Sequence, residues 1–271
     1  MKWRYCDMKV GISLYSYGGD FHSRRISVRQ AILHAAEIGC EGIELIGDQH
    51  LPNWPYTSIS ELVDLRDLIQ SLGMEVSCFS SYLVYMLRSD RNQTQEELIR
   101  VAKEHINIAN ILGAKICRPI YSADNKKDLF HVINACLPIL KQCNIIWALE
   151  VHSPFPPSFY NEVIQEINSP FVRLLPDFSC WQSMGLPTEF SANNIETFKE
   201  ILPYTAYCHG KAHVFDANGE EPNTPYKALL QALKEINFDG YVVAEYEGWM
   251  MGYADSRAIV KTHFDLINKY R

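Results

Sequence analysis

The sequence of 271 residues predicts an α/β protein folded as a single (β/α)8 barrel, or TIM barrel, that takes up residues 1–271 as one domain. Eight short apolar runs alternate with eight segments of helical pattern, and this alternation is typical of parallel strands joined by helices. No low-complexity linker divides the chain. Barrels of this kind commonly use about 250 residues as one domain, so the length agrees with the pattern.

The predicted strands are short apolar runs, most of them without polar alternation. Such runs are typical of strands that are buried on both faces, as in a parallel sheet. In chain order we expect strands at residues 9–14, 42–45, 74–79, 114–118, 145–152, 171–176, 204–208 and 240–244.

The predicted helices are bounded by capping residues. Ser27 is a suitable N-cap, and Ser58 with Glu61 three residues later has the pattern of a capping box. A glycine follows several of the expected C-terminal ends. We expect helices at residues 27–38, 58–72, 94–112, 126–143 (interrupted at Pro138), 158–167, 226–236 and 255–269, with a short helix that ends near residue 201. Loops are expected at residues 15–25 (rich in glycine), 46–57, 80–93 and 178–192.

Composition excludes several classes of protein. Hydrophobic residues make up 47% of the chain, which is enough for a large core. The net charge is −7 and there is no basic run, so we expect no nucleic-acid partner. No apolar run approaches the length of a membrane span, and the first residues lack the apolar segment of a signal peptide. The eight cysteines form no C-x-x-C pair. We expect reduced thiols and a cytoplasmic protein.

Four of the predicted strands run into a residue that can bind a metal ion. These residues are Glu150, Asp177, His209 and Glu245. In a barrel the carboxyl ends of the strands meet on one face, so these side chains should lie close together. Two glutamates, an aspartate and a histidine suit one divalent ion, with Mn²⁺ expected first and Mg²⁺, Co²⁺ or Zn²⁺ as alternatives.

This donor set leaves coordination positions open for a substrate with two adjacent oxygens, such as a hydroxyketone. The ion would polarise the carbonyl and stabilise the enediolate that forms when the neighbouring C–H loses its proton. Glu150 and Glu245 could act on the two sides of the substrate as base and acid. His152 should point the same way as Glu150 in an extended chain, which makes it a further candidate base.

The motifs around these residues resemble those of a known family, the xylose-isomerase-like barrels, over essentially the whole chain. Residues 41–45 are similar to the second strand of that family. The metal motifs are matched by Leu149-Glu150-Val151-His152, Leu175-Pro176-Asp177, Cys208-His209-Gly210-Lys211 and Ala244-Glu245-Tyr246-Glu247-Gly248. The resemblance implies that Glu150, Asp177, His209 and Glu245 bind the metal, and that the two glutamates exchange protons in the epimerases of the family.

Two details distinguish branches of the family. Many of the epimerases have a histidine three residues after the aspartate, where this chain has Cys180 after Asp177. Conversely, Glu150-x-His152-x-Pro154 resembles the α subunits of bacterial C-glycoside-cleaving enzymes, in which that histidine is the expected base.

Each candidate also has a plainer interpretation. A glutamate at the end of a buried strand can be an ion-pair partner, His213 could replace His209 as a ligand, and His152 could only orient Glu150. Five residues are candidates for substrate binding, although each could instead serve packing, an ion pair or the solvated surface: Lys211, Arg118, His50, Trp54 and Trp181. For Arg118 the specific alternative is a pair with Glu150.

The leading hypothesis is a metal-dependent isomerase or epimerase of a sugar or sugar phosphate. The alternative is a lyase that uses the same proton removal to expel a leaving group from a 3-keto glycoside, or a related dehydratase. A sugar-binding subunit without catalysis is disfavoured, because it would need no pair of proton-transferring glutamates. The expected partner is a small carbohydrate, and a homo-oligomer or a small partner subunit is compatible with the sequence.

Overall fold

The computed structural model describes residues 8–83, 93–120, 126–152, 156–179, 195–250, 252 and 255–271. In this part of the chain eight parallel strands form one sheet in the order β6-β5-β4-β3-β2-β1-β8-β7. The strands are β1 (Lys9–Ser13), β2 (Gly42–Ile46), β3 (Glu75–Tyr82), β4 (Ile116–Ile120), β5 (Ile146–Val151), β6 (Val172–Pro176), β7 (Tyr207–Ala212) and β8 (Tyr241–Tyr246).

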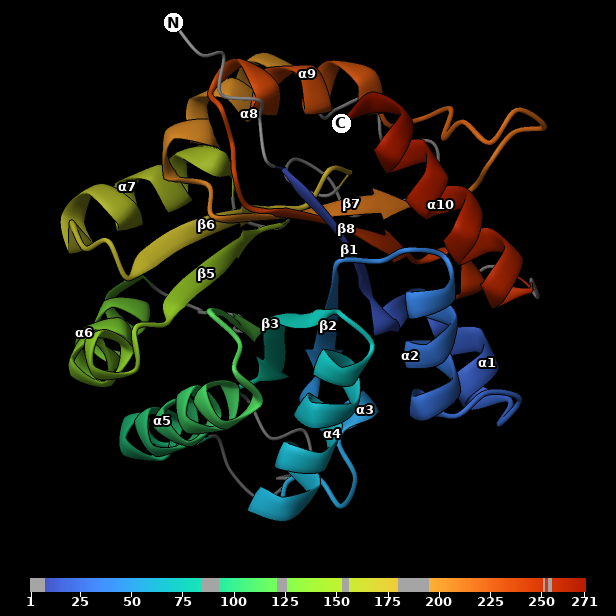
Figure 1. The fold of residues 1–271 in the computed structure, drawn as a ribbon. Helices are drawn as coiled ribbons and strands as arrows, with labels where there is room; N and C mark the ends of the chain where they lie inside the picture. The colour runs from blue at the N-terminus through green and yellow to red at the C-terminus, as the bar shows by residue number, and fades with distance from the viewer. Residues whose placement is uncertain are drawn as a thin grey trace, which may run out of the picture.

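The sheet curves round until β6 and β7, the strands at its two edges, lie next to each other (Figure 1). The helices lie outside the sheet. Between β6 and β7 only isolated bridges join the strands, at Leu174 with Thr205 and at Asp177 with His209. The Phe178 N–H donates to the His209 carbonyl at 2.9 Å beside the second bridge. The molecule is therefore a nearly closed (β/α)8 barrel, as the sequence predicted.

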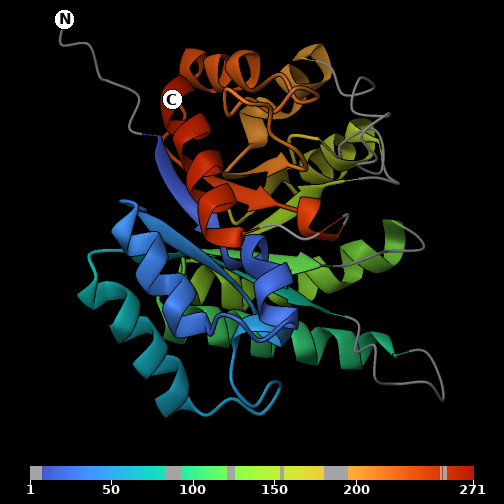
Figure 2. The ribbon, with the colours of Figure 1, turned by 90° about the vertical axis from the view of Figure 1, so that its right-hand side faces the viewer.

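The helices surround the strands in a single layer, which is also visible from the side (Figure 2). Ser27 and Ser58 form the capping boxes expected from the sequence, with Gln30 and Glu61 as partners. The helical segments are η1 (Leu14–Tyr17), α1 (Gly18–His22), α2 (Val28–Glu37), α3 (Gly47–His50), α4 (Ile59–Ser71), α5 (Gln95–Leu112), α6 (Lys126–Cys143), α7 (Pro157–Ile167), α8 (Ile195–Ile201), η3 (Leu202–Tyr204), α9 (Tyr226–Glu235), η4 (Gly248–Met250) and α10 (Ser256–Tyr270).

The prediction for the seventh strand was wrong by several residues. Residues 202–204 form η3, and the strand runs from Tyr207 to Ala212. Pairing with β8 keeps the chain extended up to Ala212, which lies opposite Tyr246. As a result His209 lies inside the strand and not beyond its end.

Three further expectations were wrong. The glycine-rich segment after β1 is helical, as η1 and α1, and the loop 46–57 contains the one-turn helix α3. Helix α6 continues through Pro138 without interruption. It packs along α5, and such packing can offset the hydrogen bond that a proline removes.

The described cysteines are free thiols: Cys40, Cys78, Cys117, Cys136, Cys143 and Cys208. Among the described helices, none is both long and apolar enough to cross a membrane.

Candidate metal centre

The register of the strands determines which side chains enter the barrel. A small apolar cluster packs together with members from six strands: Cys78, Ile116, Ala148, Leu175, Tyr207, Tyr241 and Val243. Because side chains alternate along a strand, a residue two positions further on points to the same side. The residues two positions after six members of this cluster are Ser80, Arg118, Glu150, Asp177, His209 and Glu245. A polar layer therefore lies directly above the apolar one.

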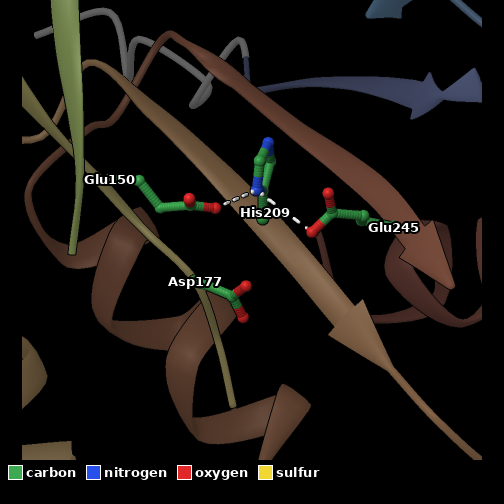
Figure 3. A group of neighbouring side chains, drawn as sticks. All are labelled: Glu150, Asp177, His209 and Glu245. Carbon is green, nitrogen blue, oxygen red and sulfur yellow. Dashed lines mark hydrogen bonds and ion pairs between the residues drawn. The ribbon is translucent and has the colours of Figure 1, made fainter. Parts of the chain in front are cut away.

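Four of these residues form a compact group of possible metal ligands. One donor atom from each of Glu150, Asp177, His209 and Glu245 lies within 4.8 Å of all the others. The Nδ1 atom of His209 is 2.9 Å from Glu150 Oε1 and 3.1 Å from Glu245 Oε2. The two glutamates approach the imidazole from opposite sides, and Asp177 lies beside them (Figure 3). The four residues predicted from separate strands are thus brought together.

Two cations lie next to this group. Arg118, on β4, is buried, and its Nη1 donates to Glu150 Oε1 at 2.8 Å. Lys211 is also buried, with Nζ at 2.8 Å from Glu245 Oε2, 3.2 Å from Asp177 Oδ2 and 2.9 Å from Glu247 Oε2. Lys211 and His209 share one face of β7, as alternation along the strand requires.

Negative charge predominates in the site. Two cations face a larger set of carboxylates, namely Glu44, Glu150, Asp177, Glu245 and Glu247. When all five are ionised and the His209 imidazole is neutral, as a metal ligand must be, three negative charges are left uncompensated, and a divalent ion would reduce them to one. Uncompensated buried charge is costly unless it is paired or bound to a metal.

The pKa values of the carboxyl groups follow from their neighbours. Burial alone would raise the pKa of Glu150, but Arg118 and His209 hold it well below its usual value. The pKa of Glu245 is likewise lowered, because His209 and Lys211 outweigh burial. Burial raises the pKa of Asp177, and Lys211 only partly opposes this shift.

The same neighbours shift the pKa of His209. Burial alone would lower the pKa of its imidazole, but Glu245 and Glu44 raise it well above its usual value.

The surroundings of two buried carboxylate oxygen atoms indicate whether the residues fit a metal ion. Asp177 Oδ2 and Glu245 Oε2 have no hydrogen bond of good geometry from the described residues, although the Lys211 ammonium lies within ion-pair distance of both and His209 Nδ1 lies 3.1 Å from Glu245 Oε2. Buried polar atoms normally have a partner, so exceptions need an explanation. Three carboxylates and one imidazole also have the donor chemistry of a divalent-ion site. The residues present therefore fit such an ion.

The sequence interpretation missed one residue that contacts this group. Glu44, on β2, is completely buried, and its Oε2 lies 2.9 Å from His209 Nε2. The Ser80 hydroxyl donates to Glu44 Oε1 at 2.5 Å. The available signal was a lone carboxylate in the apolar run 42–46, because such a group needs a partner inside the barrel.

Other predicted residues do not belong to the group of four donors or fall outside the described residues. His152 follows β5, and its carbonyl accepts a hydrogen bond from the Tyr160 hydroxyl at 3.1 Å. His213, the alternative ligand, does not belong to the group of four and has its Nε2 at 3.5 Å from Glu247. Trp181 and Cys180 fall outside the described residues.

Two predicted substrate-binding residues make contacts within the protein. His50 is buried, and its Nδ1 accepts the Ile46 N–H at 2.8 Å. The half-buried Trp54 packs against Phe79 and His105, with ring centroids 6.2 and 5.2 Å away. These contacts suit packing roles, and their predicted roles in substrate binding stay predictions.

Comparison with known proteins identifies the family. The family model described as "Xylose isomerase-like TIM barrel" matches residues 32–263. The chain belongs to this family. The match spans most of the chain and includes all four residues of the candidate metal centre.

The curated relatives of the chain include α subunits of deglycosidases. The 3′-dehydrocarminate deglycosidase alpha subunit of a Microbacterium species is 23% identical, with 91% of this chain and 90% of that protein covered. The C-glycoside deglycosidase alpha subunit of Arthrobacter globiformis is 25% identical, with 88% and 84% covered. Both relatives are named as alpha subunits of deglycosidases.

Solved structures share the fold at lower identity. The IOLI protein, solved with a bound zinc atom, superposes with a TM-score of 0.72 at 20% identity, with 97% of this chain and 99% of that chain covered. A 3-keto-D-glucoside 4-epimerase from E. coli superposes with a TM-score of 0.67 at 13% identity and the same coverage. A D-psicose 3-epimerase gives a TM-score of 0.70 at 14% identity, again with 97% and 99% covered.

Proposed function

We propose that the protein is a divalent-metal-dependent enzyme that removes a proton from the carbon next to the ketone of a sugar. The observation that carries this proposal is the group of Glu150, Asp177, His209 and Glu245, with two buried carboxylate oxygens that have no hydrogen bond of good geometry from the described residues. A divalent ion bound there would polarise the ketone oxygen and lower the free energy of the negative charge that develops on it.

The residues of this chain would then handle the proton. Glu150 or His152 accepts it from the carbon, and the electron pair of the broken C–H bond moves toward the ketone oxygen. Glu245 lies on the other side of His209 from Glu150 (Figure 3) and would deliver or accept a proton at the opposite face of the substrate. Lys211 contacts Glu245 and would donate a hydrogen bond to a substrate oxygen.

We favour a 3-keto glycoside as the substrate. One curated relative is named for a 3′-dehydro glycoside, and one structural neighbour is a 3-keto-D-glucoside 4-epimerase. In such a sugar the proton would leave C2, which lies between the ketone at C3 and the glycosidic carbon C1. The electron pair left on C2 can then form the C1–C2 double bond as the bond to the aglycone breaks, while the aglycone takes up a proton.

The two outcomes of this first step correspond to different enzymes. Expulsion of the aglycone makes the protein a lyase of the deglycosidase type, and return of the proton on the other face makes it an epimerase. Because the curated relatives cover about nine-tenths of this chain, we favour the lyase, with the Mn²⁺-dependent epimerase or isomerase as second candidate. These relatives are alpha subunits, so we also propose that a second subunit assists the reaction.

One experiment separates these outcomes. The protein is loaded with Mn²⁺ and incubated in D₂O with 3-keto glucosides that carry O-linked or C-linked aglycones. After the ion is removed, the products are followed by NMR. We expect aglycone release, and deuterium at C2 of recovered substrate if the proton transfer is reversible. Inversion without release would support the epimerase, whereas neither exchange nor release with any 3-keto sugar would refute the proposed substrate class.

A further inference from the structure

We infer that Glu44 is a positioning residue that holds the imidazole of His209 in the tautomer whose Nδ1 faces the metal ion. This inference rests on the proposed function, because it presupposes that the four donor residues bind an ion. Glu44 lies on β2 and is not one of the four donors. Its contact with the site is therefore visible only in the folded barrel.

The two nitrogen atoms of His209 have different surroundings. Nδ1 faces Glu150 Oε1 and Glu245 Oε2, which belong to the donor group, at 2.9 and 3.1 Å. Nε2 is 2.9 Å from Glu44 Oε2 and faces away from that group. When an ion takes the lone pair of Nδ1, the remaining ring proton must lie on Nε2, where Glu44 accepts it. A carboxylate in this position fixes the tautomer and makes the imidazole a stronger donor to the ion.

The contacts of Glu44 favour this role over a simple ion pair. Its carboxylate is 0% exposed, and the hydrogen bonds it accepts among the described residues come from His209 and from the Ser80 hydroxyl. Arg118 Nε is 4.0 Å from Glu44 Oε1, which is too long for a hydrogen bond, and Nε has no hydrogen-bond partner among the described residues. The Glu44 carboxylate is therefore oriented by the imidazole and the Ser80 hydroxyl, while Arg118 contributes only a longer-range charge interaction.

Ser80 completes the chain of contacts. Its hydroxyl donates to Glu44 Oε1 at 2.5 Å, on the oxygen that does not face His209. This bond restricts rotation of the carboxylate, so that the other oxygen stays directed at Nε2. The contacts thus run across the barrel, from Ser80 on β3 through Glu44 on β2 to the donor residue His209 on β7.

The test compares Glu44→Gln with the wild-type protein, using Zn²⁺ as the probe because it is diamagnetic. Affinity is measured by competition with a chelator, and the tautomer of His209 by long-range ¹H–¹⁵N NMR on ¹⁵N-histidine-labelled protein, with His209→Gln to assign the signal. We expect a proton on Nε2 and the metal on Nδ1 in the wild type. In Glu44→Gln we expect about 10- to 100-fold weaker binding, as is usual when an outer partner of a metal ligand is lost.

Glu75→Gln is the matched control, because Glu75 is half-exposed and pairs with Lys9, outside the donor group. It should bind Zn²⁺ like the wild type. If Glu44→Gln does not fold, Ser80→Ala replaces it and should weaken binding in the same direction by a smaller factor. Equal affinity in the folded Glu44→Gln protein, or a wild-type spectrum with the metal on Nε2, would overturn the inference. If the wild type binds no Zn²⁺ or Mn²⁺, the proposed function fails as well.

Discussion

Asp177 is the residue whose environment most requires a bound cation. Its carboxylate is completely buried, and its Oδ2 has no hydrogen bond of good geometry from the described residues. Burial raises its pKa, and Lys211, which lies within ion-pair distance of it, is shared with Glu245 and Glu247. A divalent ion would provide the missing partner. Removal of the negative charge of Asp177 should therefore weaken metal binding.

We expect Asp177→Asn to weaken Mn²⁺ binding by more than about 100-fold, beyond the range typical of outer-shell partners. The amide oxygen has the same size but lacks the charge that attracts the ion. Isothermal titration of metal-free protein provides the measurement, with the exposed Asp239→Asn as control. If Asp177→Asn binds as tightly as the wild type, the ion is held elsewhere.

His152 distinguishes the two proposed reactions. If it is the base, His152→Gln should lower the rate by about 10²- to 10⁴-fold while the metal content stays constant. If Glu150 is the base and His152 only orients it, the loss should be nearer 10- to 100-fold. The rate of proton exchange in D₂O is measured together with metal content. A small loss would remove the main residue-level reason for favouring the lyase.

At the scale of elements, helix α5 contributes a buried histidine that does not belong to the group of four donors. His105, on α5, is 3% exposed and packs against Trp54 and Phe79. Its Nε2 is 3.4 Å from the Ser81 hydroxyl. Burial lowers the pKa of this histidine to about 4, so it stays neutral in the folded protein under mildly acidic conditions.

This burial should make the fold sensitive to acid. Between pH 6.5 and about 4 the unfolded chain binds a proton at His105 that the folded chain does not, so stability falls as the pH falls through this range. The effect is about 1.4 kcal/mol per pH unit. From pH 7 to pH 5 the wild type should therefore lose about 2 kcal/mol more than His105→Gln. Urea unfolding at both pH values measures this difference, and equal losses would contradict it.

At the scale of the whole molecule, the candidate metal centre lies at the seam of the barrel. Between β6 and β7 only isolated bridges join the strands, and one of them pairs Asp177 with His209. Two of the four donors thus come from opposite sides of a junction that is joined by isolated bridges. An ion that binds both would link these strands and stabilise the closed barrel.

We therefore expect Mn²⁺ to raise the melting temperature. An ion at about 100 times its dissociation constant stabilises the native state by about 2.7 kcal/mol. For a protein of this size each kcal/mol shifts the midpoint by about 2–4 °C, so the rise should be roughly 5–10 °C. Calorimetry with Mn²⁺ and then with excess chelator gives the measurement. A similar rise in Asp177→Asn would mean that the stabilisation arises at another place.

The sequence by itself determined the barrel and the four residues that meet at its centre. Unbroken apolar runs such as 145–149 specify strands that are buried on both faces, and eight alternations with helices leave few topologies. Since the carboxyl ends of parallel strands meet on one face, Glu150, Asp177, His209 and Glu245 could be expected together without knowing any distance.

Only the tertiary structure decided what surrounds these four residues. The extent of β7 depended on pairing with β8, a contact distant in sequence, and it placed His209 and Lys211 inside the strand. The role inferred for Glu44 depends on where β2 comes to lie in the closed barrel, because its partner His209 is 165 residues away along the chain. Local pattern determines which segments form strands, whereas the partners of a buried charge are determined by packing between segments that are far apart in sequence.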